Sequence, residues 1–187
     1  LLANTNALTE FLPEALSAFL ADHPHISVDF YERLSDEIVG LVAEGVADAG
    51  IVAGTVDMGS LTTYPFRSDR FVVVTAKDHP LAKRGRVNFG EVLDYDVVGL
   101  DRTSSLQRFL AGKAAREGRP LRLRVQLRSF DAVCRLVECG VGVGVVPQTT
   151  AARAAKTMQL AIAELTDDWA LRELTIVVRA PGELRPY

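Results

Sequence analysis

The chain has 187 residues, of which 48% are apolar and 24% charged, the balance of a globular protein rather than a disordered one. Its net charge of −3 and pI near 5.7 give this segment no electrostatic basis for gripping DNA. It contains no apolar run of about 18 residues, so no membrane span is predicted. The length suits one domain or two small lobes. The start at Leu1, without methionine, predicts a fragment of a longer protein.

The chain has only two cysteines, Cys134 and Cys139. On the helix expected there, they lie roughly 7.5 Å apart along the axis and on different faces, beyond comfortable disulfide reach. Two cysteines without a nearby histidine are also too few for a structural zinc site. The sequence therefore predicts two small buried residues, no metal and no cofactor, in a reduced, cytoplasmic protein.

The first third of the chain alternates between strand and helix patterns. The expected elements are a strand at 1–3, a helix from Leu8 until His23-Pro24, a strand over 26–30, a helix capped by Ser35 and ended by Gly45, and a buried strand over 49–52. Pro13 falls inside the first helix pattern, so it should lie near the helix start or mark a kink. The βαβαβ order implies a parallel sheet covered by helices.

A second α/β unit follows, similar in form but not in sequence. The expected elements are strands over 97–100, 121–127, 141–146, 160–162 and 174–178, and helices from Thr103-Ser104-Ser105 to about Glu117, over 130–139 and over 151–156. One crossover out of the first lobe requires another one back, so the last strand is assigned to the first lobe. The predicted lobes are 1–76 with 173–187, and 77–172, with a cleft between them.

The stretch from Pro65 to Ala82 predicts the outward crossover. Phe71–Val74 is an unbroken apolar run between charged flanks, typical of a buried strand. It leads into His79-Pro80, where the proline ends sheet pairing and forces the chain to exit. His79 is expected to be a cap or bend residue rather than a catalytic base.

Two further patterns argue against nucleotide binding and catalysis. The glycines of Gly140-Val-Gly-Val-Gly144 follow a helix and enter a strand, whereas a dinucleotide-binding turn follows a strand and opens a helix. Gly140 is therefore predicted to end the helix, and Gly142 and Gly144 to allow close packing. The chain has no Gly-x-Ser-x-Gly, HExxH or P-loop motif, so we do not expect an enzyme.

Small polar residues stand where strands hand over to helices, at Thr5-Asn6 and at Thr103-Ser104-Ser105. Free backbone N–H groups and the helix dipole at such turns attract carboxylates and phosphates, and in open α/β sheets these turns line the binding crevice. Each turn serves equally well as a simple helix cap, and so do Ser35 and Ser129. Arg67 and Arg102 either balance the charge of an acidic ligand or are ordinary surface residues.

The stretch from Pro65 to Leu93, with its His-Pro-Leu-Ala run, and the stretch from Leu136 to Pro147 resemble the effector-binding domain of LysR-type bacterial transcription regulators. The Leu12-Pro13 helix and Gly45 with Asp48-Ala49 follow the same family pattern. The resemblance covers nearly the whole chain. It implies an α/β fold of the type 2 periplasmic-binding-protein class, with two Rossmann-like subdomains joined by two crossover segments.

The resemblance also implies a set of residues in contact with an effector. These are Thr5, Asn6, Ser35, Ala53, Gly54, Thr55, Asp101, Arg102, Thr103 and Ser104, with Phe130, Val146, Pro147 and Gln148 completing the wall. Some relatives carry an arginine in the loop after the third strand, where this chain has Ala53-Gly54-Thr55, which argues against a strongly charged ligand.

The leading hypothesis is a ligand-sensing module whose cleft binds an organic acid or a similar metabolite. The family implies a homodimer or homotetramer that contacts DNA only through an N-terminal winged helix-turn-helix missing from this chain. The alternative is a solute-binding protein of a transporter, which has the same fold and no link to DNA.

Overall fold

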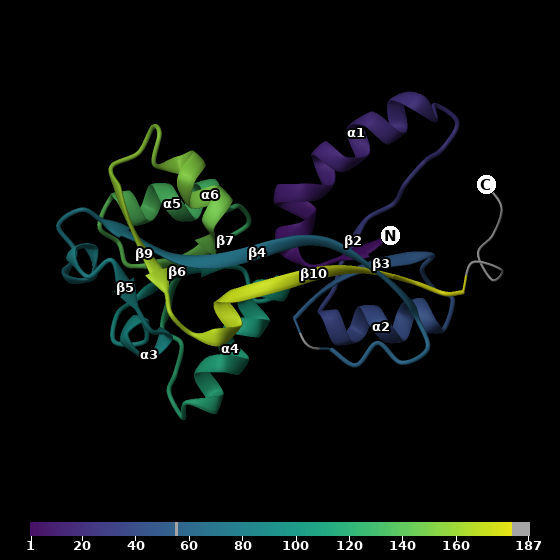
Figure 1. The fold of residues 1–187 in the computed structure, drawn as a ribbon. Coiled ribbons are helices and arrows are strands. Elements are labelled where there is room, and N and C mark those ends of the chain that lie inside the picture. The colour runs from purple at the N-terminus through teal and green to yellow at the C-terminus, as the bar shows by residue number, and fades with distance from the viewer. Residues whose placement is uncertain (55, 181–187) are drawn as a thin grey trace. The chain divides into compact units, whose positions relative to one another are not determined.

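The computed structural model describes residues 1–54 and 56–180, which belong to two compact units. Unit 1 contains Leu1–Ser68 and the segment from Arg172 onward, and unit 2 contains Asp69–Leu171. The strands β4 (Thr62–Ala76) and β10 (Leu171–Val178) each carry the chain from one unit into the other (Figure 1). No helix in residues 1–54 and 56–180 combines the length and apolar character of a membrane span.

Unit 1 is built on a parallel sheet, as the βαβαβ order predicts. Its strands β2 (Tyr31–Glu32) and β3 (Ala49–Ala53) pair in parallel on either side of β1 (Leu2–Ala3). The strand β10 pairs antiparallel with β3, from Leu174 opposite Ala53 to Val178 opposite Ala49. The expectation that the last strand returns to the first lobe is therefore confirmed.

Helices cover both faces of this sheet because neighbouring strand residues point to opposite sides. The helix α2 (Ser35–Ala43) packs Ile38 and Val42 against one face, in a cluster with Leu2, Val52 and Val177. On the other face, Ala7 and Leu12 cluster with Ala3, Ile51 and Leu174. Figure 1 shows α2 and α1 on opposite sides of these strands.

The helix on the second face begins irregularly, as Pro13 predicts. A π-helical turn, η1 (Ala7–Phe11), precedes the α-helix α1 (Leu12–Asp22), and Pro13 lies in the first turn of α1. Proline lacks an N–H and clashes with the carbonyl four residues earlier, so regular α-helical bonding cannot continue through it.

The strand predicted over 26–30 is wrong, because pairing begins only at Tyr31. The neighbouring strand β1 has two residues, so it can hold only two partners in register, Tyr31 opposite Leu2 and Glu32 opposite Ala3. The alternation of Ile26, Val28 and Phe30 therefore has no partner strand to pair with.

Unit 2 contains two groups of strands. In the first group, β8 (Gly144–Pro147) and β9 (Leu160–Leu165) pair antiparallel with β4, and β5 (Arg86–Val87) pairs parallel with β9. In the second, β6 (Val97–Leu100) and β7 (Leu123–Leu127) form a parallel pair. The helices are α3 (Phe89–Val92), α4 (Ser105–Arg116), α5 (Phe130–Glu138) and α6 (Gln148–Ala154), with short 3₁₀ turns η2 (Pro80–Lys83) and η3 (Asp168–Ala170).

Most elements predicted for unit 2 are present with shifted ends, and two details differ. The helix expected over 151–156 begins earlier, at Gln148, directly after the buried Pro147. Cys134 is buried as predicted, but Cys139 is exposed. The reason is that Cys139 is the C-cap of α5, where the helix leaves the core.

The glycine run is used for close packing, as predicted. A Cβ on Gly142 would lie 2.3 Å from the carbonyl oxygen of Asp96, to which Val143 N–H donates at 3.0 Å. Gly140 follows the end of α5 with φ of 74°. His79 is a cap, because its Nδ1 accepts from Leu81 N–H at 3.2 Å at the start of η2.

Candidate functional site

The turn after β1 is built from polar side chains that hold one another. The Oδ1 of Asn4 accepts from Ala7 N–H at 3.0 Å, which satisfies the first turn of the following helix. The Thr5 hydroxyl donates to the carboxylate of Glu32, which β2 brings alongside because Glu32 is paired in register with Ala3. Asn4 and Thr5 therefore shape this turn.

Asn6 differs from Asn4, whose Oδ1 is paired although its Nδ2 has no partner among the described residues. Asn6 is 1% exposed, and among the residues that the structure describes neither its Nδ2 nor its Oδ1 has a hydrogen-bond partner. An unpaired buried amide costs about 1–3 kcal/mol for each unsatisfied group, so such groups need an explanation. Asn6 thus offers one donor and one acceptor group for a partner from outside the protein.

Ser35 and Ala53 meet at the end of β3, but Ser35 is not the helix cap that the sequence predicts. Leu34 is the N-cap of α2 and Ser35 its first residue. The Ser35 Oγ does not cap the helix and instead accepts a hydrogen bond from Ala53 N–H at 2.9 Å. Gly54 follows with φ of 77° and donates its N–H to Glu173 O at 3.1 Å. Thr55 lies outside the residues that the structure describes.

The turn after β6 folds around the carboxylate of Asp101. Its Oδ1 accepts from the backbone N–H of Thr103 at 2.9 Å and from the Thr103 hydroxyl, while Ser104 N–H donates to Asp101 O at 3.1 Å. These bonds hold the pKa of Asp101 below its ordinary value, the Thr103 hydroxyl contributing most. The lowered pKa keeps the Asp101 carboxylate ionised, so this turn carries a negative charge.

The remaining predicted wall residues lie in the packing of unit 2. Ser104 is the N-cap of α4, its Oγ accepting from Gln107 N–H at 3.4 Å. Phe130, Val146 and Pro147 are buried, the first two in the main hydrophobic cluster, whereas Gln148 is exposed. Of the last four, only Gln148 presents its side chain to solvent.

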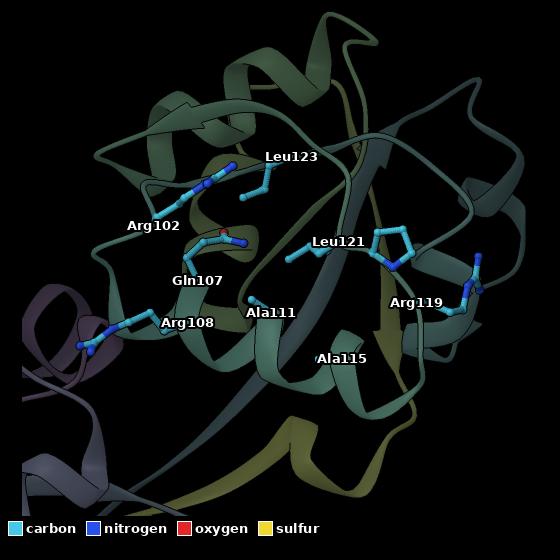
Figure 2. A pocket seen from close by; sticks show the side chains of 9 residues that line it. Arg102, Gln107, Arg108, Ala111, Ala115, Arg119, Leu121 and Leu123 are labelled. Carbon is cyan, nitrogen blue, oxygen red and sulfur yellow. The ribbon is translucent and has the colours of Figure 1, made fainter.

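The two arginines singled out from the sequence have different surroundings. In unit 1, Arg67 is exposed, and its guanidinium carbon lies 5.8 Å from the centre of the Phe66 ring. In unit 2, Arg102 lines a cavity of about 400 Å³ beside α4. Figure 2 shows the Arg102 and Gln107 side chains beside one another, with Leu123 close by. The full lining is Arg102, Gln107, Arg108, Ala111, Ala115, Arg119, Pro120, Leu121 and Leu123.

No three His, Cys, Asp or Glu side chains gather within residues 1–54 and 56–180 as a metal site would require. The polar groups that gather in the two turns and the cavity are amides, hydroxyls, guanidinium groups and the single carboxylates of Glu32 and Asp101, a set that suits hydrogen bonding to organic ligands.

Comparison with known proteins decides the family. A family model described as the LysR substrate binding domain matches residues 2–187. The chain belongs to the LysR substrate-binding domain family. The transcriptional regulator YbhD of Escherichia coli K12 is 27% identical over 180 residues, which cover 96% of this chain and 56% of YbhD. A probable RuBisCO transcriptional regulator of Cyanidioschyzon merolae is 24% identical over 144 residues, 74% of this chain and 48% of that protein. This LysR domain therefore spans about half the length of the curated relatives it matches.

Solved structures show the fold of this LysR domain. The Synechocystis PCC6803 CcmR regulatory domain in complex with 2-PG has a TM-score of 0.74 at 22% identity, over 98% of this chain and 88% of that one. The effector-binding domain of QuiR in complex with shikimate has a TM-score of 0.67 at 17% identity, over 99% and 88%. The predicted type 2 periplasmic-binding-protein fold is thereby confirmed.

Sequence reasoning missed three polar residues of this LysR domain that its structure brings forward, Asn4, Glu32 and Gln107. Asn4 stands two residues before Asn6, and the strand-to-helix handover could have signalled its role. Glu32 reaches Thr5 only through strand pairing, and Gln107 reaches the cavity only through the packing of α4. Neither contact leaves a local signal in the sequence.

Proposed function

We propose that this LysR domain binds a small-molecule effector and controls the transcription regulator of which it is a part. The match to the family across residues 2–187 supports this role, and the relatives are transcription regulators rather than transporter proteins. The CcmR and QuiR domains of the same fold hold 2-PG and shikimate. Nothing in the relatives favours a catalytic role or a solute-binding protein of a transporter.

The effector site proposed here is centred on Asn6 and the strand-to-helix turn of unit 1 that the sequence predicts. The observation that carries it is Asn6, a buried amide with neither polar atom paired among the described residues. It stands after a parallel strand, at the sheet edge where α/β proteins bind ligands. Ser35, Ala53 and Gly54 follow neighbouring strands at the same edge.

The effector class proposed is an organic acid or a similar metabolite with hydroxyl groups. Asn6 can donate to a carboxylate or carbonyl and accept from a hydroxyl. No lysine or arginine occurs in residues 1–32, and Ala53 and Gly54 carry no charged side chain. A ligand bound at this turn relies on neutral hydrogen bonds, which favours polar oxygens over a high charge.

Effector binding would act on the regulator by favouring one arrangement of the domain over another. A ligand shifts such an equilibrium only by its difference in affinity for the two arrangements. The regulator would act in the cytoplasm and contact DNA through a part that lies outside this chain. A dimer reads paired half-sites that are one helical turn, or a multiple of it, apart.

We also propose that the domain forms a homodimer or homotetramer in which α1 is buried. In α1 only Leu12 is buried, while Ala15, Ala18 and Phe19 are exposed, Phe19 by 41%. An apolar helix face left open in this way is typical of an interaction surface. Phe19→Glu should lower the sedimentation-derived mass at a given concentration, whereas Tyr64→Glu, which alters another exposed aromatic of unit 1, should not.

The effector site is tested by calorimetry of the purified domain against a panel of hydroxy acids and related metabolites. Asn6→Ala removes a donor and an acceptor that have no partner among residues 1–54 and 56–180, so it should cost no folding stability yet weaken binding of the hit by about tenfold or more. Asn88→Ala is the matched control: it removes the cap of α3, so it should cost about 1 kcal/mol of stability and leave binding unchanged.

Two results would overturn the proposal. One is a bound metabolite whose affinity is the same in Asn6→Ala as in the unsubstituted domain. The other is a full-length regulator whose response to effector survives both Asn6→Ala and Ser104→Trp in reporter assays.

A further inference from the structure

A second candidate site lies wholly within unit 2, in the cavity beside α4. It is bounded by α4 and by residues 119–123, which lead into β7, and its volume is about 400 Å³. Pockets for small molecules have volumes of roughly 300–1,000 Å³. The turn residues Thr5, Asn6 and Ser104 do not line it, and Arg102 is the one lining residue that it shares with the effector contacts predicted from the sequence.

The inner end of the cavity holds a buried amide donor. Gln107 is 2% exposed, and its Nε2 has no hydrogen-bond partner in the described part of the chain. The strand beneath it leaves room for this side chain, because a Cβ on Gly99 would lie 2.5 Å from the Gln107 Oε1. A buried N–H group without an acceptor is costly, so this amide is a donor that an acceptor from outside the protein can satisfy.

Arg102 supplies a positive charge beside that donor. It forms no ion pair within residues 1–54 and 56–180, and Figure 2 shows it on the same side of the cavity as Gln107. Arg119, at the other end, is already engaged, donating to Asp94 Oδ1 and to Gly90 O, each at 2.6 Å. Arg108 also lines the cavity, but Figure 2 shows its side chain directed away from Gln107. Arg102 and Gln107 are therefore the donor pair at this end of the cavity.

Apolar side chains line the cavity between these two ends. Ala111 and Ala115 come from α4, and Leu121 and Leu123 from the segment that enters β7. Figure 2 shows Leu121 and Ala111 between the Gln107 end and the Arg119 end. A ligand that fills the space needs an apolar body and one anionic head.

We propose that this cavity binds a small carboxylic acid with an aryl or branched alkyl body. Its carboxylate would accept from Gln107 Nε2 and from the Arg102 guanidinium, a charge-assisted pair stronger than neutral hydrogen bonds. The body would cover Leu121, Leu123 and Ala111. The site goes beyond the proposed effector function and does not depend on it.

The rival occupant is an acidic segment of a second copy of this chain. Residues 1–32 contain Glu10, Glu14, Asp22, Asp29 and Glu32 and no lysine or arginine. A stable protein interface buries about 800 Å² on each partner, which is much more than a cavity built around one recessed amide provides. We therefore favour the small acid, and the experiment separates the two occupants.

The test is a titration of the ¹⁵N-labelled domain with phenylacetate, and in parallel with the neutral phenylacetamide. Phenylacetate should shift the side-chain amide resonance of Gln107 in a saturable way, with an affinity at least about tenfold higher than that of phenylacetamide. Gln107→Glu, which keeps the volume but places a carboxylate in the cavity, should reduce the phenylacetate affinity by about tenfold or more, and Arg102→Gln should do the same. Arg116→Gln, an exposed cation of α4 outside the cavity, is the matched control and should leave it unchanged.

The proposal is overturned if phenylacetate binds Gln107→Glu as tightly as the unsubstituted domain, or if phenylacetate and phenylacetamide bind equally. It is also overturned if the Gln107 amide resonance moves with protein concentration and not with added acid, because a second copy then fills the cavity. Asn6→Ala should retain phenylacetate binding, so failure of the effector proposal and failure of this one give different results.

Discussion

At the scale of single residues, Gly142 and Asp101 each depend on one short-range contact. Gly142 lets the chain pass against Asp96, at a separation that leaves no room for a methyl group. Asp101 holds its turn together through Thr103. Both contacts can be tested by removing or adding a few atoms.

Gly142→Ala should destabilise unit 2 by about 1–3 kcal/mol, because its Cβ would lie 2.3 Å from a backbone oxygen that cannot rotate away. The measurement is urea unfolding followed by the fluorescence of Trp169. Gly112→Ala serves as the control: nothing lies within 4 Å of its Cβ, and alanine in a helix should be neutral or stabilising by up to about 1 kcal/mol. Equal midpoints for the two variants would contradict the packing described here.

Thr103→Val should raise the pKa of Asp101 toward its ordinary value, since the Thr103 hydroxyl is the main cause of the low pKa. A carboxyl whose pKa is lower in the folded state stabilises the fold above its unfolded pKa. That stability is lost as the pH falls through the folded pKa. The valine variant should therefore be less stable than the unsubstituted domain at neutral pH, and this difference should disappear at low pH, where the Asp101 carboxyl is protonated in both.

A carbon-detected NMR titration of the Asp101 carboxyl measures this pKa directly. Thr103→Ser keeps the hydroxyl and should keep the low pKa. An Asp101 midpoint that is the same in the valine variant and the unsubstituted domain would show that the hydroxyl bond is not the cause.

At the scale of elements, α2 is attached to the sheet by an arginine that follows β10. Arg179 Nη1 donates to Val42 O and to Ala47 O, each at 2.8 Å, and its Nη2 lies 3.9 Å from Asp48 Oδ1. These bonds join Val42 O, in the last turn of α2, and Ala47 O, in the loop that follows α2, to one guanidinium group. The element depends on a residue more than a hundred positions away.

Arg179→Met should destabilise unit 1 by about 1.5–3 kcal/mol, the value of hydrogen bonds to a charged group. Amide hydrogen exchange should rise first at the end of α2 and in β3. Arg33→Met is the control, because the Arg33 guanidinium donates to the carbonyl of its neighbour Glu32, and its loss should change exchange little. Uniform acceleration across both units in Arg179→Met would contradict a local role.

At the scale of the whole molecule, each unit has a core of its own. Ile38 and Val42 belong to a cluster of unit 1, while Phe71, Phe89 and Val133 belong to the large cluster of unit 2. Trp169 is the only tryptophan of the chain, and it packs edge-on against Phe89 and Phe109 at 5.3 Å from each ring. Its fluorescence therefore reports on unit 2 alone.

Ile38→Ala should lower the stability of unit 1 by about 2–5 kcal/mol through the cavity it leaves. Hydrogen exchange in α2 and β1 should record this loss, while the midpoint of Trp169 fluorescence stays in place. Val133→Ala should move the fluorescence midpoint instead. If Ile38→Ala moves both signals equally, the two units unfold as one cooperative body.

The sequence by itself determined the order of most elements, the parallel sheet of unit 1 and the family. Apolar period, helix breakers and turn residues act over a few neighbouring positions, so the runs at Phe71–Val74 and Val97–Leu100 and the stops at Pro24 and Gly45 can be predicted without a structure. The return of the last strand followed from chain connectivity alone.

Only the tertiary structure decided where pairing and packing take place between distant residues. The two-residue length of β1 limits β2 to Tyr31–Glu32. The Ser35 hydroxyl bonds to Ala53 in the neighbouring strand rather than to its own helix. Gln107 is a buried donor because its side chain and that of Leu123 pack over Gly99, which has no Cβ to exclude them. Such contacts depend on three-dimensional register, which local periodicity does not encode.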